Sequence, residues 1–383
     1  MQNITYLDNA ATTAVDPAVV DAMIPYLTGY FGNPSSNYSI GRLTKTAIES
    51  ARKNVAGLLG VKATSIYFTS GGTESNNTAI ATAVTAMGCK HMITSPIEHH
   101  AVLNTVAYHC RQNGVTSSYV ALGEYGKVDL QDLERQLKEK AAQGIKCLVS
   151  LMHANNEIGT LLDLKSVGEL CKTYGAIFHS DGVQTIGHYP VNLSDYHLHF
   201  ASASGHKFHG PKGTGILYVA EGTKATPLIH GGGQERRLRA GTENVHGIVG
   251  FAKALELAMD TFATDQPYIQ SLNRRLRAGL LKHSPAFTFN NAEDGLYTVL
   301  SVNFPEGIHP DFLLSYLDQA GICVSGGSAC SSGDDLGSHV IQAIGKKGSG
   351  ATVRFSFSKL TTEKDIDFAL ETIGRFLQSH YKR

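Results

Sequence analysis

The sequence lacks any excess of charge. Its 383 residues include 33 Lys and Arg and 33 Asp and Glu, so the formal net charge is zero. Proteins that bind nucleic acid or anionic membrane usually carry a basic excess, and this balance indicates neither a direct nucleic-acid partner nor a membrane partner. No apolar run approaches the roughly 20 residues of a membrane-spanning helix, and the first residues, MQNITYLDNAATT, do not have the pattern of a signal peptide. We therefore expect a cytoplasmic protein.

Paired cysteine motifs are also absent. The six cysteines, at positions 89, 110, 147, 171, 323 and 330, form no CxxC pair, and their spacing suits neither a disulfide framework nor a zinc site. We expect most of them to be small buried apolar side chains. Cys330 is the exception, because it lies in the small and polar stretch SACSSG. A thiol in such surroundings is accessible for chemistry.

Short β-rich segments alternate with helical patterns through the first two thirds of the chain. The segments with strand composition are SIYFTS, HMITSP, SSYVAL, CLVSLMH, AIFHSD, HFASAS and GILYV, and patterns such as LQDLERQLKEKAAQG lie between several of them. This order predicts an α/β protein with a mostly parallel central sheet covered by helices on both faces.

A change of character after about residue 251 predicts a second domain. A long helical pattern is followed there by a smaller α+β section that runs to the C-terminus. The chain is also too long for one hydrophobic core. We expect a large domain at residues 13–255 and a small domain made of residues 1–12 and 256–383.

Polar residues follow five of the predicted strands in succession. In an open parallel sheet, ligands bind beyond the carboxyl ends of the strands, so such residues indicate a site. They are Gly72 with Thr73 at the start of a predicted helix, Glu98 with His99, the stretch 153–157, Asp181 with Gln184, and Ser204 with His206 and Lys207.

Lys207, in the stretch SGHKFHGPKG, has three possible interpretations. It could be an ordinary surface lysine, part of a phosphate-binding loop, or a lysine that forms an imine. The spacing from Gly205 to Gly210 fits the first half of a Walker motif, but Pro211 follows where that motif requires lysine. Lys212, after this proline, is better placed for solvent.

A pyridoxal phosphate site accounts for the whole set. This cofactor needs a lysine for a Schiff base and an acid beside its pyridine nitrogen. It also needs a ring against its face and donors for its phosphate. These roles can be filled in that order by Lys207, by Asp181, by His99, and by the group Thr73, Ser204 and His206.

The motifs, in this order, resemble those of the cysteine desulfurases, which are fold-type I pyridoxal-phosphate enzymes of the class V aminotransferase group. They run from Tyr6 to Ser356 and are YLDNAATT, GGTESNN, EHHAVL, MHANNEIG, HSDGVQT, SGHKFHGPKG, GGGQERRLRAGTEN, GGSACSSG and VRFS. The long GGGQERRLRAGTEN and SACSSG stretches make the chain similar to the nitrogen-fixation and iron–sulfur-cluster type.

The resemblance implies a role for each matching residue. Lys207 would be the Schiff-base lysine, Asp181 the partner of the pyridine nitrogen, and His99 the stacked and catalytic histidine. Gln184 would donate to the phenolic oxygen of the cofactor, with Asn155 close by. The phosphate would be bound by Gly72, Thr73, Ser204 and His206, and by Thr242 from the other subunit of a homodimer. Arg354 and Asn33 would hold the substrate carboxylate, and Cys330 would accept the sulfur.

The implied activity is removal of sulfur from L-cysteine, which gives L-alanine and a persulfide on Cys330. An acceptor protein would take the persulfide for iron–sulfur cluster, thio-cofactor or thiolated-tRNA synthesis. The alternatives are a selenocysteine lyase, a class V aminotransferase and a non-catalytic sulfur-transfer scaffold. The cysteine in GGSACSSG argues against an aminotransferase, which does not use one. The presence of Lys207, Asp181, His99, Arg354 and Cys330 together argues against a non-catalytic scaffold. Departures from the family pattern are Thr185, the pair Ser358–Lys359, and the absence of a glutamate–proline pair after Cys330.

Overall fold

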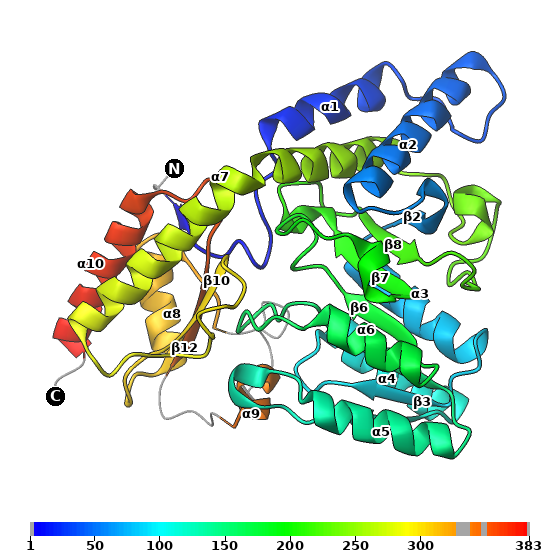
Figure 1. The fold of residues 1–383 in the computed structure, drawn as a ribbon. Helices are drawn as coiled ribbons and strands as arrows, with labels where there is room; N and C mark the ends of the chain where they lie inside the picture. The colour runs from blue at the N-terminus through cyan, green and yellow to red at the C-terminus, as the bar shows by residue number, and fades with distance from the viewer. Residues whose placement is uncertain (1–3, 327–337, 346–350, 381–383) are drawn as a thin grey trace.

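A seven-stranded sheet forms the centre of the larger part of the protein (Figure 1). The structure is a computed structural model, and it describes residues 4–326, 338–345 and 351–380. The sheet consists, in spatial order, of β2 (Ile66–Thr69), β8 (Gly215–Val219), β7 (Phe200–Ser204), β6 (Ile177–Asp181), β5 (Cys147–Ser150), β3 (His91–Thr94) and β4 (Thr116–Tyr119). Only β8 runs antiparallel to its neighbours, so the predicted mostly parallel α/β sheet is confirmed.

Helices cover both faces of this sheet because its inner strands are apolar on both sides. In β5, for example, Val149 packs in the core on one face and its neighbour Leu148 packs in the core on the other. Buried residues of α3 (Gly72–Thr85) and α4 (His100–Asn113) belong to the core that contains Leu148. The opposite core includes buried residues from α1 (Pro17–Thr28), α2 (Ser39–Leu58), α5 (Leu130–Ala142) and α6 (Leu164–Thr173).

A second, antiparallel sheet builds the smaller part of the protein. Its order is β12 (Thr352–Ser356), β10 (Val299–Asn303) and β9 (Thr288–Phe289). It packs with α8 (Pro310–Gln319) and α10 (Glu363–His380) around a separate core. The N-terminal strand β1 (Thr5–Tyr6) joins this part, because it pairs with β11 (Ile322–Cys323) and Leu7 is buried in the same core.

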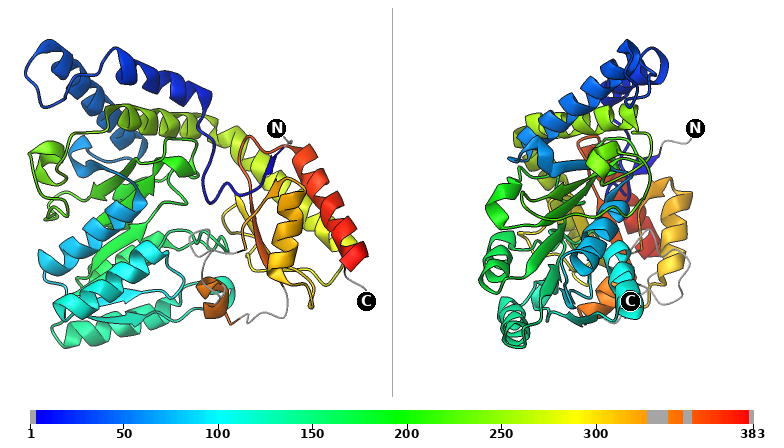
Figure 2. Two further views of the ribbon diagram at one scale, coloured as in Figure 1. Left: turned by 180° about the vertical axis from the view of Figure 1, so that it is seen from behind. Right: turned by 90° about the vertical axis from the view of Figure 1, so that its right-hand side faces the viewer.

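One long helix, α7 (Val245–His283), connects the two parts, as Figure 2 shows from behind. Its buried residues up to Leu255 belong to the core of the large sheet, and those from Ile269 onward belong to the second core. The predicted domain boundary at residue 255 therefore falls inside a continuous helix, and the division itself stays a prediction. No helix in the described part of the chain is long and apolar enough to span a membrane.

Candidate active site

A pocket lies at the carboxyl ends of β5, β6 and β7, where the sequence predicts a site. Most of the predicted cofactor residues line it together with the predicted substrate arginine. The lining residues are Ala10, Ala11, Gly72, Thr73, Asn76, His99, Met152, Asn156, Asp181, Val183, Gln184, Ser204, His206, Lys207 and Arg354.

Asp181 ends β6 and is held by a buried hydrogen-bond network. Asn76 Nδ2 donates to its carboxylate at 2.6 Å, and the backbone N–H of Val183 donates to the other oxygen at 3.0 Å. His179 and Ser202 both contact the amide oxygen of Asn76, which fixes the direction of that amide. Burial lowers the pKa of His179 to about 3, so this ring is neutral. The network therefore presents an oriented carboxylate to the pocket.

The start of α3 also lines the pocket. Gly71 has a φ of 151°, and a Cβ on Gly72 would lie 2.5 Å from a methyl carbon of Val183, so only glycine fits at position 72. The free N–H groups at the first turn of a helix attract anions. Thr73 and the buried Ser204 line the pocket as well.

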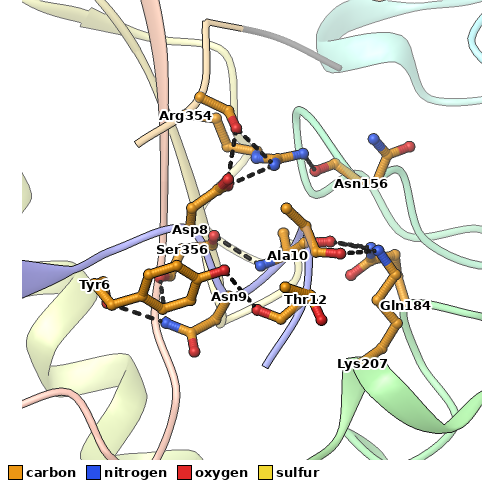
Figure 3. Close-up of polar contacts among 12 residues, drawn as sticks. Tyr6, Asp8, Asn9, Ala10, Thr12, Asn156, Gln184, Lys207, Arg354 and Ser356 are labelled. Atoms are coloured by element: carbon orange, nitrogen blue, oxygen red, sulfur yellow. Dashed lines mark hydrogen bonds and ion pairs between the residues drawn. The ribbon is translucent and has the colours of Figure 1, made fainter. Parts of the chain in front are cut away.

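Lys207 follows β7 in a short 3₁₀ turn and points toward the N-terminal segment (Figure 3). Its ammonium donates to the carbonyl oxygens of Ala10 and Ala11 at 2.7 and 2.8 Å. Gln184 Nε2 donates to the same Ala10 oxygen at 3.1 Å. Lys212, the lysine that could be confused with it, is exposed and does not line the pocket.

His99 caps the N-terminus of α4 and faces the pocket. Its Nδ1 accepts the N–H of Ala101 at 3.0 Å, so the neutral ring carries its proton on Nε2. Burial lowers the pKa of His99, and nearby Lys207 acts in the same direction while Asp181 opposes both. The ring is therefore neutral at neutral pH and can exchange a proton at Nε2.

Arg354 projects from β12 of the smaller part into the same pocket (Figure 3). Its guanidinium is 2.7 Å from the carboxylate of Asp8 and donates to the carbonyl oxygen of Asn156 at 3.0 Å. It is 2% exposed, and its Nε has no hydrogen-bond partner among the described residues. A buried guanidinium with remaining donor capacity suits a ligand carboxylate.

Three of the predicted site residues that the structure describes do not line the pocket of this chain. Asn155 is buried, but its amide holds the turn around Ile158 and bonds the carbonyl of Ile97, and the next residue, Asn156, lines the pocket instead. Asn33 and Thr242 are exposed on loops away from the pocket. The fourth predicted residue outside the list of lining residues, Cys330, lies outside the described part of the chain.

Sequence reasoning assigned no role to three residues that shape the site. Asn76 orients Asp181, Asp8 pairs with Arg354, and Asn156 supplies a carbonyl to the same arginine. All three lie inside the quoted motifs GGTESNN, YLDNAATT and MHANNEIG. Their place in these motifs could have marked all three as candidate site residues. No rule of sequence spacing, however, predicts that Asp8 contacts a partner 346 residues away.

The fold and the site together define the class of this protein. The class-V aminotransferase family matches residues 5–368, and the chain belongs to it. Within that family it belongs to the cysteine desulfurases. It is 44% identical to the cysteine desulfurase IscS of Methanosarcina thermophila, over 97% of this chain and 92% of that one.

Solved structures agree with this assignment. A NifS-like protein superposes with a TM-score of 0.90 at 37% identity, over 98% of this chain and all of the other. A structure described as SspA in complex with cysteine superposes with a TM-score of 0.79 at 30% identity, over 93% of this chain and 99% of the other.

Proposed function

We propose that this protein is a pyridoxal-phosphate-dependent cysteine desulfurase that moves the sulfur of L-cysteine onto Cys330. The observation that carries the proposal is the convergence of Lys207, Asp181, His99 and Arg354 on one pocket. These residues come from four separate segments, three in the larger part of the protein and one, Arg354, in the smaller part. The relatives named as desulfurases support it, as does the SspA structure, which contains cysteine.

The donor set of the pocket fits pyridoxal phosphate. The glycine-lined start of α3 provides amides for a phosphate, Lys207 offers an amine, and the oriented carboxylate of Asp181 suits a protonated ring nitrogen. His99, Gln184, Ser204, His206 and Thr73 complete the residues that would hold the group. When bound, the cofactor supplies an electron sink for the bonds around the substrate α-carbon.

The residues of the chain bind the substrate and move its protons. Arg354 would exchange part of its contact with Asp8 for the substrate carboxylate. The Lys207 amine takes and returns a proton at Nζ, and the carbonyls of Ala10 and Ala11 stabilise it while it is charged. His99 takes or gives a proton at Nε2, close to where a substrate thiol would lie.

The sulfur transfer balances with Cys330 as the second nucleophile. Its thiolate attacks the substrate sulfur, an S–S bond forms, and the bond from that sulfur to the substrate β-carbon breaks. The electron pair and a proton remain with the substrate, which leaves as alanine. The net products of L-cysteine and the Cys330 thiol are therefore L-alanine and the Cys330 persulfide. The attacking group must be a thiolate, because the thiol itself is a poor nucleophile.

A homodimer would account for Asn33 and Thr242. Both residues are exposed on this chain and outside its own pocket, as expected if a partner subunit uses them. Large apolar side chains are also exposed on α1, α2 and the loop between them, namely Val20, Ile24, Leu27, Tyr30, Phe31, Tyr38 and Leu43.

We propose further that an acceptor protein in the cytoplasm takes the persulfide. A reducing compartment suits the five described cysteines, which are all free thiols.

The decisive experiment follows alanine and protein mass after a single turnover with L-cysteine. Wild type should form alanine and gain one sulfur on Cys330. Cys330→Ala should still bind the cofactor but form little alanine and no persulfide. Cys323→Ala is the matched control, because Cys323 lies on β11 only seven positions earlier, and it should remain active. A persulfide on another cysteine, or full alanine production by Cys330→Ala, would refute the proposal.

A further inference from the structure

The short helix α9 (His339–Ala343) follows the sequence that carries Cys330 and packs against the large sheet's side of the protein. Val340 and Ile341 are buried and form a small apolar core with Ile97 and Ile158. Ile97 precedes the Glu98–His99 pair, and Ile158 ends the Asn155–Ile158 turn. Both partners of α9 therefore belong to loops that border the candidate active site.

A buried carboxylate holds Ser338, the residue just before this helix. Ser338, the N-cap of α9, donates its hydroxyl to Glu157 Oε2, and the same hydroxyl accepts the N–H of Ile341 at 3.2 Å. Glu157 is only 2% exposed, and its other oxygen has no hydrogen-bond partner among the described residues. Burying a carboxylate with few hydrogen-bond donors around it costs free energy. The hydrogen bond from Ser338 therefore stabilises this region more than a hydrogen bond on the surface would.

His339 gives a second polar attachment beside the active-site histidine. Its Nε2 lies 3.0 Å from the carbonyl oxygen of Glu98, and its ring centre lies 4.6 Å from that of His100. Glu98 and His100 are the chain neighbours of His99. The position of α9 is thus fixed against the same short stretch that presents His99 to the pocket.

The described residues before and after Cys330 connect to the same loop. Ser325 pairs through its backbone with Arg354, and Arg354 donates to the carbonyl of Asn156. Ser338 donates to Glu157, the next residue along the chain. The Asn156–Glu157 pair therefore links the substrate arginine to both sides of the sequence that carries the sulfur acceptor.

We infer that Glu157 is a positioning residue for sulfur transfer: it holds Ser338, the first described residue after Cys330, and with it keeps α9 against the loop that presents His99. This inference rests on the proposed function. Glu157 touches neither substrate nor cofactor in this role. Its loss should slow persulfide formation without weakening the binding of L-cysteine, which is assigned to Arg354.

Three variants separate this role from simple helix capping. Ser338→Asn keeps a capping acceptor and also a donor for Glu157. Ser338→Asp keeps the capping acceptor but places a second carboxylate against Glu157. Glu157→Gln/Ser338→Asp restores the hydrogen bond with donor and acceptor exchanged. Ser166→Asp is the matched control, because Ser166 donates to the carboxylate of Asp163 in a similar but exposed pair.

Two measurements are made on the full-length holoenzyme. The first is the single-turnover rate of persulfide formation on Cys330 by mass spectrometry, with the KM for L-cysteine measured in parallel. The second is amide hydrogen exchange of the peptide covering α9. We expect Ser338→Asp to slow persulfide formation by about tenfold or more and to speed exchange in α9 by a similar factor, as for the loss of a buried charge-assisted hydrogen bond. The KM should change by less than about twofold.

Ser338→Asn and the double variant should recover the rate to within about threefold of wild type, and Ser166→Asp should match wild type. If Ser338 acted only as a cap, Ser338→Asp would behave as wild type, and that result would overturn the inference. Failure of the double variant to recover either measurement would overturn it as well. A wild type that forms no persulfide would instead refute the proposed function, and the exchange data would still decide whether Glu157 holds α9.

Discussion

Replacing Arg52 should destabilise the protein more than any change to a surface charge. Arg52 of α2 donates two hydrogen bonds at 2.8 Å to the carboxylate of Glu235, and a third at 2.8 Å to the carbonyl of Ile66. Its guanidinium also lies 4.9 Å from the ring centre of Phe68. Both partners of the ion pair are 3% exposed at the side chain, so neither charge can be solvated when the other is removed.

The segment that this pair holds is strained. Glu235, Arg236 and Arg237 have φ values of 43°, 53° and 71°, in the left-handed region that residues other than glycine avoid. Each such residue costs about 1–3 kcal/mol, which the contacts of Glu235 must offset. The segment leads into the RAGTEN stretch that contains Thr242. Its shape is therefore set by a charge pair that lies more than 180 residues apart in sequence.

We expect Arg52→Met to lower the free energy of unfolding by about 3–5 kcal/mol, the usual cost of removing one partner of a buried ion pair. Methionine keeps most of the length and the apolar contact with Phe68, so the loss reports the removed polar contacts, which are those with the carboxylate of Glu235 and the carbonyl of Ile66. Arg52→Met/Glu235→Gln should recover a large part of it, because glutamine is neutral and can still accept the N–H of Phe68. Urea titration followed by circular dichroism measures both values.

Lys62 and Glu221 provide the control pair. They are 2.8 Å apart, but their side chains are 67% and 71% exposed. Lys62→Ala should change the free energy of unfolding by about 1 kcal/mol or less. If Arg52→Met cost no more than Lys62→Ala, or if the double variant were less stable than the single one, the reasoning from burial would be wrong.

Three further predictions concern the site, the buried thiols and the assembly. Lys207→Ala should abolish covalent attachment of the cofactor, whereas Lys212→Ala should keep it. Borohydride reduction followed by peptide mapping shows which lysine is attached, and a label on Lys212 would refute the assignment. Burial raises the pKa of Cys89 to about 12 and that of Cys147 to about 11, so both thiols should stay protonated and resist iodoacetamide in the native protein at about pH 8, yet react once urea unfolds it. Sedimentation should give a dimer at assay concentration, and an active monomer would contradict the shared site.

That several candidate residues share one pocket could be predicted from the sequence where they lie at or after strand ends. Their chemical roles stay predictions. Lys207, Asp181 and His99 each follow a strand of a parallel sheet, and parallel strands bring their carboxyl ends to one edge. Their place on the pocket could therefore be inferred from order alone. The resemblance added Arg354, which belongs to the second sheet and which no pattern within the first sheet could place.

Two kinds of detail could not be predicted from the sequence. One is which distant residues contact each other, and the other is which of two neighbouring candidate residues faces the pocket. The pairing of Arg354 with Asp8 depends on how the N-terminal segment crosses between the two sheets, and this is set by packing rather than by spacing. Asn155 and Asn156 are neighbours in one motif, and only the turn decides which of them lines the pocket. The positions of Asn33 and Thr242 in an active site stay predictions.

The continuous α7 affects how this protein can be divided or engineered. At about 1.5 Å per residue, its 39 residues give roughly 60 Å of helix along a bent path (Figure 1), without a loop where the chain could be cut. A fragment that ended near residue 255 would lose Leu257 and Met259, which pack against the large core. A fragment that began after the helix would leave the second core without Ile269, Leu272 and Leu276. A split or domain-swapped version of this protein should therefore have its junction in an exposed loop and keep this helix whole.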